Sequence, residues 1–194
     1  PVAGKPMLQH IIERAKSQGF GRFVLSLNYL GRMIRDHFGD GSAYGATIAY
    51  VEENEPLGTA GALSLLQPRP ESAFVVTNGD VLTDIDYREL IEFRERHNAH
   101  GVMAVRIYEW TNPYGVVQME GVNIIGFAEK PVSRSHINAG VYAFSPAVLD
   151  HLVRNRHCDM PTLFDRLREA KHRTVAYPMH EPWLDVGRPD DLER

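Results

Sequence analysis

Short apolar segments alternate with amphipathic segments through the first half of the chain, and this alternation is the strongest constraint on its fold. Residues 23–27 and 73–77 are nearly continuous apolar runs, which is typical of strands buried on both faces. In the segment between Pro6 and Gly19, apolar residues recur at helical spacing. This pattern predicts an α/β fold whose largely parallel sheet is covered by helices on both faces.

The same reading places the remaining elements along the chain. We expect further strands at residues 47–51 and 102–108, and helices at about 30–38, from about 59, and at 86–97. After residue 110, strand-like segments at 115–119, 123–128 and 137–144 follow one another closely, which suggests antiparallel additions. Helices near 146–154 and 161–171 and a strand at 174–177 complete the pattern. With no repeat or linker, it predicts one domain over residues 1–194.

Composition excludes several classes of function. The chain has 194 residues, 43% of them hydrophobic and 24% charged, as in ordinary soluble proteins. A net charge of −4 argues against nucleic acid or an anionic membrane as partner. The sequence holds no apolar run near the roughly 20 residues that span a bilayer. The lone Cys158 cannot form an internal disulfide, so we expect a cytoplasmic protein.

Asn78, Gly79 and Asp80 directly follow the apolar run that ends at Thr77. In open α/β sheets, ligands bind outside the carboxyl ends of the strands. A carboxylate there suits a hard cation such as Mg²⁺, and a neighbouring glycine lets a phosphate approach closely. A tight turn without any ligand is an equally good reading of this tripeptide taken alone.

Small residues surround the start of a helix in Leu57-Gly58-Thr59-Ala60-Gly61-Ala62. Such a segment can bring backbone groups against a nucleobase, or a helix N-terminus against a phosphate. The alternative is a helix capped by Thr59, with small residues that allow close packing.

Three polar residues near the closely spaced strands could meet a phosphosugar. Lys130 could neutralise a sugar phosphate, and the adjacent Glu129 could accept hydrogen bonds from sugar hydroxyls. Asn138, at the start of the next apolar strand, could hold hydroxyls through its amide. An exposed ion pair at 129–130 and a turn-favouring Asn138 are the simpler readings.

Asp185 is a second acidic residue in an apolar setting, within Trp183-Leu184-Asp185-Val186. A partly buried carboxylate needs a partner, and a metal ion shared with Asp80 would supply one, whereas Arg188 would supply an ion pair. Asp84-Ile85-Asp86 has the form of the metal motif of many glycosyltransferases. Asp86, however, precedes Glu89 at the spacing of a capping box, so we expect it to cap a helix.

Taken in order, these segments resemble the sugar-1-phosphate nucleotidyltransferase (NDP-sugar pyrophosphorylase) family, nearest its mannose-1-phosphate or glucosamine-1-phosphate guanylyltransferase-like branch. The residues that carry the resemblance span essentially the whole chain: 4–7 (GKPM), 56–63 (PLGTAGAL), 78–80 (NGD), 113–117 (PYGVV), 129–131 (EKP), 138–142 (NAGVY) and 183–187 (WLDVG). The resemblance implies a Rossmann-like three-layer fold with a mixed, mostly parallel sheet.

The resemblance also implies the chemistry. The enzyme would transfer a nucleoside monophosphate from a nucleoside triphosphate, GTP by nearest resemblance, to a sugar 1-phosphate and release pyrophosphate. Asp80 and Asp185 would hold Mg²⁺, and Lys130 would meet the sugar phosphate. The nucleotide would lie against Gly58, Thr59, Ala60, Gly61, Asn78 and Gly79. The sugar would be bound by Gly115, Glu129 and Asn138.

The family opens with a strand, a glycine-rich loop and a Pro-Lys-Pro that do not occur in this chain. We therefore expect an N-terminally incomplete catalytic domain, in which the strands at Val24-Leu25 and Val75-Val76 are not directly hydrogen-bonded, and which alone lacks transferase activity. The resemblance allows a homo-oligomer and upstream CBS domains in the intact protein. The competing hypotheses are a metal-dependent glycosyltransferase and a noncatalytic sugar-nucleotide sensor or regulatory subunit.

Overall fold

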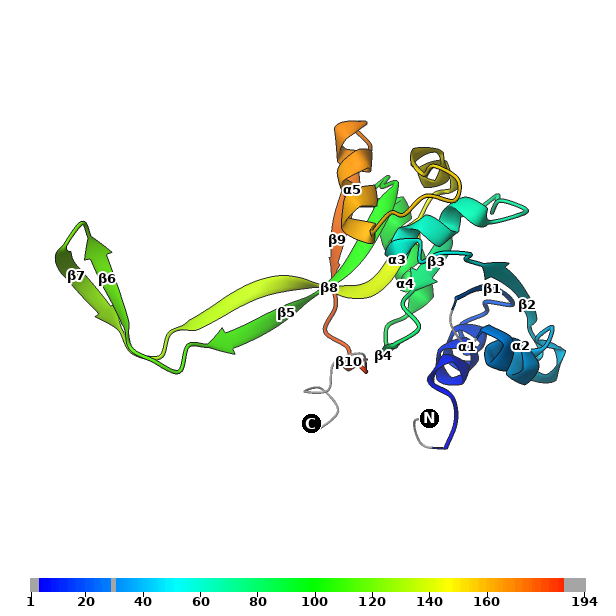
Figure 1. Ribbon diagram of the computed structural model, residues 1–194, viewed down its shortest axis with the longest axis horizontal. Helices are drawn as coiled ribbons and strands as arrows, with labels where there is room; N and C mark the ends of the chain where they lie inside the picture. Colours follow the sequence, from blue (N-terminus) through cyan, green and yellow to red (C-terminus); the bar gives the residue numbers. More distant parts are fainter. Residues whose placement is uncertain (1–3, 29–30, 187–194) are drawn as a thin grey trace.

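The computed structural model describes residues 4–28 and 31–186 (Figure 1). Its α-helices are α1 (Met7–Ser17), α2 (Gly31–Phe38), α3 (Gly58–Gly61), α4 (Tyr87–Arg96) and α5 (Met160–Glu169), and its 3-10 helices are η1 (Ser42–Tyr44), η2 (Ala62–Leu65) and η3 (Pro146–His151). Its strands are β1 (Arg22–Leu27), β2 (Thr47–Glu52), β3 (Phe74–Thr77), β4 (Val81–Thr83), β5 (Gly101–Thr111), β6 (Val116–Glu120), β7 (Asn123–Ala128), β8 (Val132–Phe144), β9 (Thr174–Pro178) and β10 (Trp183–Asp185).

A four-stranded sheet in the order β3-β8-β5-β9 forms the centre of the molecule. β8 pairs antiparallel with both β3 and β5, and β9 pairs parallel with β5. Three of the four strands therefore run in one direction and β8 runs against them. The predicted α/β class with a mixed, mostly parallel sheet is confirmed.

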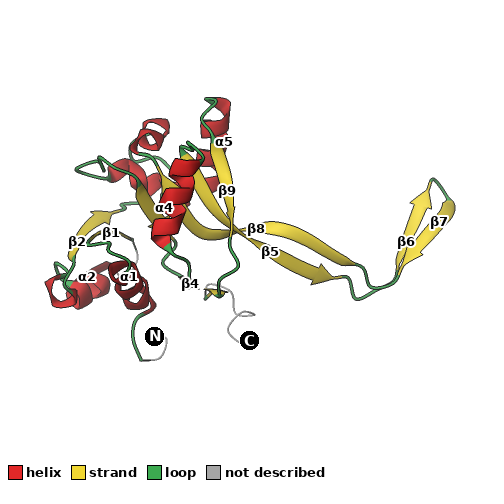
Figure 2. Cartoon of the chain, turned by 180° about the vertical axis from the view of Figure 1, so that it is seen from behind, coloured by secondary structure: helices red, strands yellow, loops and turns green. Residues whose placement is uncertain are grey.

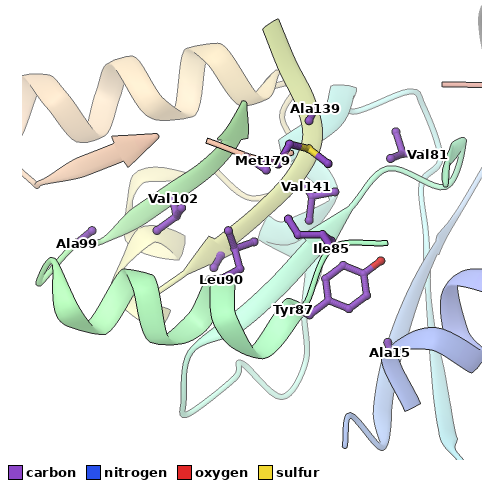
Figure 3. Close-up of a cluster of buried hydrophobic side chains, with 12 residues drawn as sticks. Ala15, Val81, Ile85, Tyr87, Leu90, Ala99, Val102, Ala139, Val141 and Met179 are labelled. Atoms are coloured by element: carbon purple, nitrogen blue, oxygen red, sulfur yellow. The ribbon is translucent and has the colours of Figure 1, made fainter. Parts of the chain in front are cut away.

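The side chains of β8 alternate between two buried faces of this sheet. Ala139, Val141 and Ala143 contribute to a core shared with Tyr87 and Leu90 of α4 (Figure 3). Tyr142 and Phe144 point the other way, into a core formed with α5, α3 and η3. Successive side chains of a strand point to opposite faces, so an unbroken apolar run in β8 can serve both cores. This arrangement gives the expected layers, with helices on both faces of the sheet.

β1 and β2 form a separate parallel pair that packs against α1 and α2. Ile12, Phe38 and Ile48 are the buried side chains of this smaller core. In the described part of the chain, β1 pairs with β2, and β3 pairs with β8. β1 and β3 are thus not directly hydrogen-bonded to each other, as the family resemblance led us to expect.

β5 and β8 continue far beyond the body as a two-stranded arm that ends in the β6–β7 hairpin (Figures 1 and 2). Their pairing runs outward from Val105–Asn138 to Thr111–Val132. β6 and β7 pair antiparallel, which confirms that the closely spaced strands after residue 110 are antiparallel additions. Large exposed apolar side chains are concentrated on this arm: Ile107, Tyr108, Trp110, Tyr114, Val117, Met119, Val122, Ile124, Ile125, Phe127 and Val132.

Four elements differ from the sequence-based expectation. β4 and β10 were not predicted, because three-residue strands are too short to show a periodic pattern. β8 begins at Val132 rather than near residue 137, since pairing with β5 holds the polar segment 133–136 extended. Residues 146–151 form a 3-10 helix instead of a longer α-helix. Within the described residues, no helix is long and apolar enough to cross a membrane.

Candidate functional site

The loop after β3 places Asn78, Gly79 and Asp80 at the carboxyl end of that strand. The backbone N–H of Asn78 donates to the carbonyl of Gly140 at 2.8 Å, which ties the loop to β8. Gly79 and Asp80 are exposed. A Cβ built on Gly79 meets no atom within 4 Å, so packing within the protein does not require glycine there. The Asp80 carboxylate is therefore exposed next to a glycine whose α-carbon is open to solvent.

Asp185 lies on the strand next to Asp80 although the two residues are distant in sequence. β10 runs antiparallel to β4, with Asp185 opposite Val81. The backbone N–H of Val186 donates to the carbonyl of Asp80 at 2.9 Å. Directly opposed residues of an antiparallel pair have Cα atoms about 4.5–5.5 Å apart, so the backbone of Asp185, opposite the residue after Asp80, lies near the backbone of Asp80.

Hydrogen bonds from neighbouring strands hold this pair in place. The indole Nε1 of Trp183 donates to the carbonyl of Ala139 at 2.8 Å, which anchors β10 to β8. Gly140 has a φ of +74°, and a Cβ there would lie 2.9 Å from Nδ2 of Asn78 and 3.0 Å from Cγ2 of Val81. The loop after β3 therefore packs directly on the backbone of β8.

Asn138 lies in the middle of β8, two residues before Gly140, and its amide is already engaged within the protein. Its Oδ1 accepts from the N–H of Gly140 at 3.0 Å, and its Nδ2 donates to the hydroxyl of Tyr142 at 2.7 Å. Burial raises the pKa of Tyr142, while the bond from Asn138 acts in the opposite direction. The phenol therefore stays neutral at physiological pH, and a ligand would meet an Asn138 whose orientation is fixed.

The predicted nucleotide loop forms the short helix α3, and its backbone donors are used inside the protein. The N–H groups of Ala60 and Gly61 both donate to the carbonyl of Cys158 at 2.9 Å. The N–H of Thr59 donates to Oδ1 of Asp159 at 3.2 Å. The first-turn N–H groups of a helix need acceptors, and residues 158–159 supply them, so these amides are engaged within the protein while the predicted contact of this loop with a nucleotide stays a prediction. Ala60 and Gly61 are buried, so Gly58 and Thr59 are the members of the loop that reach solvent.

The third group of predicted residues lies out on the arm. Gly115 and Glu129 are neighbours, since a Cβ on Gly115 would be 3.0 Å from Oε2 of Glu129. Lys130 follows in the turn before β8, with a φ of +43°. Val132 pairs six residues farther out on the arm than Asn138, which is about 20 Å along an extended strand. The structure thus brings Asn78, Gly79, Asp80, Asn138 and Asp185 together, but leaves Gly115, Glu129 and Lys130 apart from them.

Both carboxylates of the glycosyltransferase-like motif have structural partners. Asp86 caps α4, accepting from the N–H of Arg88 at 2.8 Å and from that of Glu89 at 3.4 Å, as predicted. Asp84 forms an ion pair with Arg14 of α1. Neither residue therefore favours the glycosyltransferase hypothesis.

Two further segments of the resemblance lie near the ends of the chain. In the first, residues 4–7, Lys5 pairs with Glu13 of α1 at 3.0 Å. The alternative partner for Asp185, Arg188, lies outside the described residues, as does Gly187 of the same motif.

Sequence reasoning missed the residues that support the α3 loop, above all Asp159. Asp159-Met160-Pro161 has the pattern of a helix start, with a capping acid before a first-turn proline. That signal predicts a cap for α5 itself, yet Asp159 makes no side-chain cap bond to its own helix. Its partner, Thr59, is far away in sequence and lies on another element.

Comparison with known proteins supports one consistent family. The model of the family described as nucleotidyl transferase matches residues 1–194. The chain is 35% identical over 199 residues to the probable mannose-1-phosphate guanylyltransferase 2 of Oryza sativa subsp. japonica, which covers 97% of this chain and 55% of that protein. The chain thus spans about half the length of the curated relatives it matches.

Solved structures agree with this fold. HddC from Yersinia pseudotuberculosis complexed with GMP-PN is similar with a TM-score of 0.74 and 25% identity, covering 100% of this chain and 85% of that one. A putative glucose-1-phosphate thymidylyltransferase from Bacillus anthracis is similar in fold, with a TM-score of 0.76 and 20% identity, covering 100% of this chain and 82% of that one.

Proposed function

This chain belongs to the nucleotidyl transferase family, and from that premise we propose that the protein containing it transfers a nucleoside monophosphate to a sugar 1-phosphate. The products are an NDP-sugar and pyrophosphate. The observation that carries the proposal is the position of Asp80 directly before β4, the strand that pairs with β10 and its Asp185, beside the exposed Gly79. Two carboxylates at the end of a sheet, with room for a phosphate, suit phosphoryl chemistry.

The nucleotide in this proposal is GTP. The relatives that support it are named as mannose-1-phosphate guanylyltransferases, and HddC, which is similar in structure, was solved with GMP-PN. The guanine base would approach the exposed face of Gly58 and Thr59, because Ala60 and Gly61 are buried. The α- and β-phosphates would then extend toward Asn78 and Gly79.

The donor set at Asp80 and Asp185 fits a magnesium ion. Mg²⁺ is commonly held by one or two carboxylates, with substrate phosphates and waters completing its coordination. Residues 4–28 and 31–186 contain no group of three or more His, Cys, Asp or Glu side chains able to hold a metal. The fit is therefore to an ion that binds together with the nucleotide. When bound, such an ion neutralises charge on the α-phosphate.

The reaction requires positioning more than covalent chemistry from the protein. An oxygen of the sugar 1-phosphate attacks the α-phosphorus and forms a new P–O bond, and the bond from that phosphorus to the bridging oxygen breaks as pyrophosphate leaves. Asp80 and Asp185 would hold the divalent ion that offsets the charge of the α-phosphate, and so would help to place that phosphate for in-line attack. Asn138, held by Gly140 and Tyr142, would present a fixed amide edge to the sugar.

The predicted roles of Gly115, Glu129 and Lys130 in binding the phosphosugar stay predictions. These residues are linked to the central site through one continuous strand, β8. In the intact protein, Lys130→Ala should raise KM for the sugar 1-phosphate far more than KM for the nucleotide. Equal rises in the two KM values would exclude this division of roles.

The decisive experiment measures pyrophosphate release from GTP and mannose 1-phosphate by the intact protein and its Asp80→Asn variant. We expect turnover to fall by at least about a hundredfold, with an unchanged Tm, because a neutral amide holds a divalent ion at the α-phosphate less well than a carboxylate does. Asp84→Asn is the matched control, since its carboxylate pairs with Arg14. Near-normal turnover in Asp80→Asn would exclude Asp80 as a ligand of the metal ion.

The same assay separates the competing hypotheses. Release of a nucleoside diphosphate in place of pyrophosphate would indicate a glycosyltransferase, and binding without turnover would indicate a sensor. We further propose a reducing cytoplasm as the site of the reaction, in keeping with the single, free and buried Cys158. Assembly into a homo-oligomer and attachment of CBS domains remain predictions.

A further inference from the structure

Helices α3 and α5 cap each other. Thr59 of α3 accepts, at its hydroxyl oxygen, a hydrogen bond from the N–H of Met160 at the start of α5, at 2.8 Å. Asp159, which precedes α5, accepts at Oδ1 the N–H of Thr59 at 3.2 Å. Each helix therefore receives its side-chain cap from the other, although neither Leu57 nor Asp159 caps its own helix.

Backbone hydrogen bonds also connect the α3 loop with the segment before α5. The N–H of Cys158 donates to the carbonyl of Leu57 at 2.8 Å, and its carbonyl accepts the N–H groups of Ala60 and Gly61. A Cβ on Gly58 would lie 2.6 Å from Oδ1 of Asp159 and 2.8 Å from the carbonyl of Cys158. The position of the α3 loop is thus set by direct contact with residues 158–159.

Only the outer side of this junction is open to solvent. Thr59 and Asp159 are exposed, while Ala60, Cys158 and Met160 are buried. The hydroxyl of Thr59 uses an oxygen lone pair for Met160, so its proton can still be donated to an acceptor on a ligand. The geometry of that donor depends on the two bonds that connect Thr59 with residues 159–160.

We infer that Asp159 is a positioning residue for the nucleotide: it holds Thr59 and Gly58 in the orientation that receives the base. This inference rests on the proposed function, because it assigns a role to the loop predicted to contact the nucleotide. Asp159 acts through Thr59 and does not itself touch the substrate. Its effect is therefore confined to the nucleotide side of the reaction, far from the arm that carries Lys130.

The test compares Asp159→Ala and Asp159→Asn in the intact protein. Loss of the carboxylate leaves the N–H of Thr59 without its acceptor, and we expect KM for the nucleoside triphosphate to rise about tenfold. KM for the sugar 1-phosphate should stay within about twofold. Asp159→Asn retains an oxygen in the same place and should recover most of the affinity. Asp165→Asn, six residues farther along the chain within α5 and paired with Arg168 in solvent, is the matched control.

A purely structural role would give a different result. It would lower Tm and the active fraction, and so reduce kcat, without changing KM for one substrate alone. Equal changes in the two KM values, or no recovery in Asp159→Asn at equal Tm, would overturn the inference.

Failure of the proposed function is recognised separately. If the unmodified protein binds nucleotide without releasing pyrophosphate, the proposed transferase reaction fails, and the same variants are compared by the Kd for GTP in calorimetry. An unchanged Kd in Asp159→Ala would then reject the positioning role. If the unmodified protein binds no nucleotide at all, both proposals are wrong.

Discussion

At the scale of single residues, Gly58 shows how tightly the α3 loop is packed. Its φ is +75°, in the left-handed region that disfavours L side chains, and a Cβ would approach Asp159 and Cys158 to within 3 Å. We expect Gly58→Ala to lower the free energy of unfolding by about 1–3 kcal/mol. Urea denaturation of Gly58→Ala beside Gly21→Ala, a position where a Cβ meets open space, measures the difference. Equal stability of the two variants would contradict this packing.

His100 provides a residue-scale prediction of pH dependence. Burial lowers the pKa of His100 below its ordinary value, and the charges of His172, Arg94 and His151 lower it further. The unfolded chain therefore binds this proton more readily than the folded chain. The stability contributed by neutral His100 is complete above its ordinary pKa and is lost as the pH falls through the lowered value.

Thermal unfolding at pH 7.5 and pH 5.5 tests this sign. We expect the Tm of the unmodified protein to fall by a few degrees at the lower pH, and the fall to be smaller in His100→Phe, which keeps the ring contact with His172 but cannot titrate. The difference between the two proteins isolates His100 from the other groups that titrate in this range. An identical fall in both would exclude His100 as the cause.

At the scale of elements, the start of α4 allows a test of whether Asp86 has a structural or a catalytic role. Asp86 accepts two first-turn N–H groups, so Asp86→Ala should cost about 1 kcal/mol of stability in urea denaturation. Pyrophosphate release per folded molecule should not change. Glu92→Ala, which removes an exposed contact with Arg96, should cost less than about 0.5 kcal/mol. A large loss of turnover in Asp86→Ala would instead revive the glycosyltransferase hypothesis.

At the scale of the whole molecule, the body and the arm contribute to stability in different ways. Phe144 is fully buried between the sheet and α5, whereas Phe127 is 75% exposed on the β6–β7 hairpin. We expect Phe144→Ala to cost about 3–5 kcal/mol, because it leaves a cavity in the core. Phe127→Ser should change the free energy of unfolding by no more than about 0.5 kcal/mol. Similar losses of unfolding free energy in the two variants would show that Phe127 is buried in solution, by another part of the chain or by another molecule.

The sequence by itself determined the elements of the body. Apolar runs and helical spacing predicted most strands and helices, because burial requires a period that is visible in the residues themselves. The cap by Asp86 was predicted for the same reason, since its partners lie two and three residues away. The proximity of Asp80 and Asp185 was expected from their matching placement after apolar segments and from the family resemblance.

Only the tertiary structure decided which distant segments meet. Pairing of the short strands β4 and β10 brings the segments that carry Asp80 and Asp185 together. A strand of three residues is too short to show a periodic pattern in the sequence. Residues 133–136 of β8 are polar, and pairing with β5 alone makes them a strand, which places Lys130 far from Asn138. The bond between Asp159 and Thr59 likewise joins two helix starts that lie 100 positions apart in sequence. In each case a hydrogen-bonding partner distant in sequence stabilises the local structure, and a pattern in the neighbouring residues does not show which partner that is.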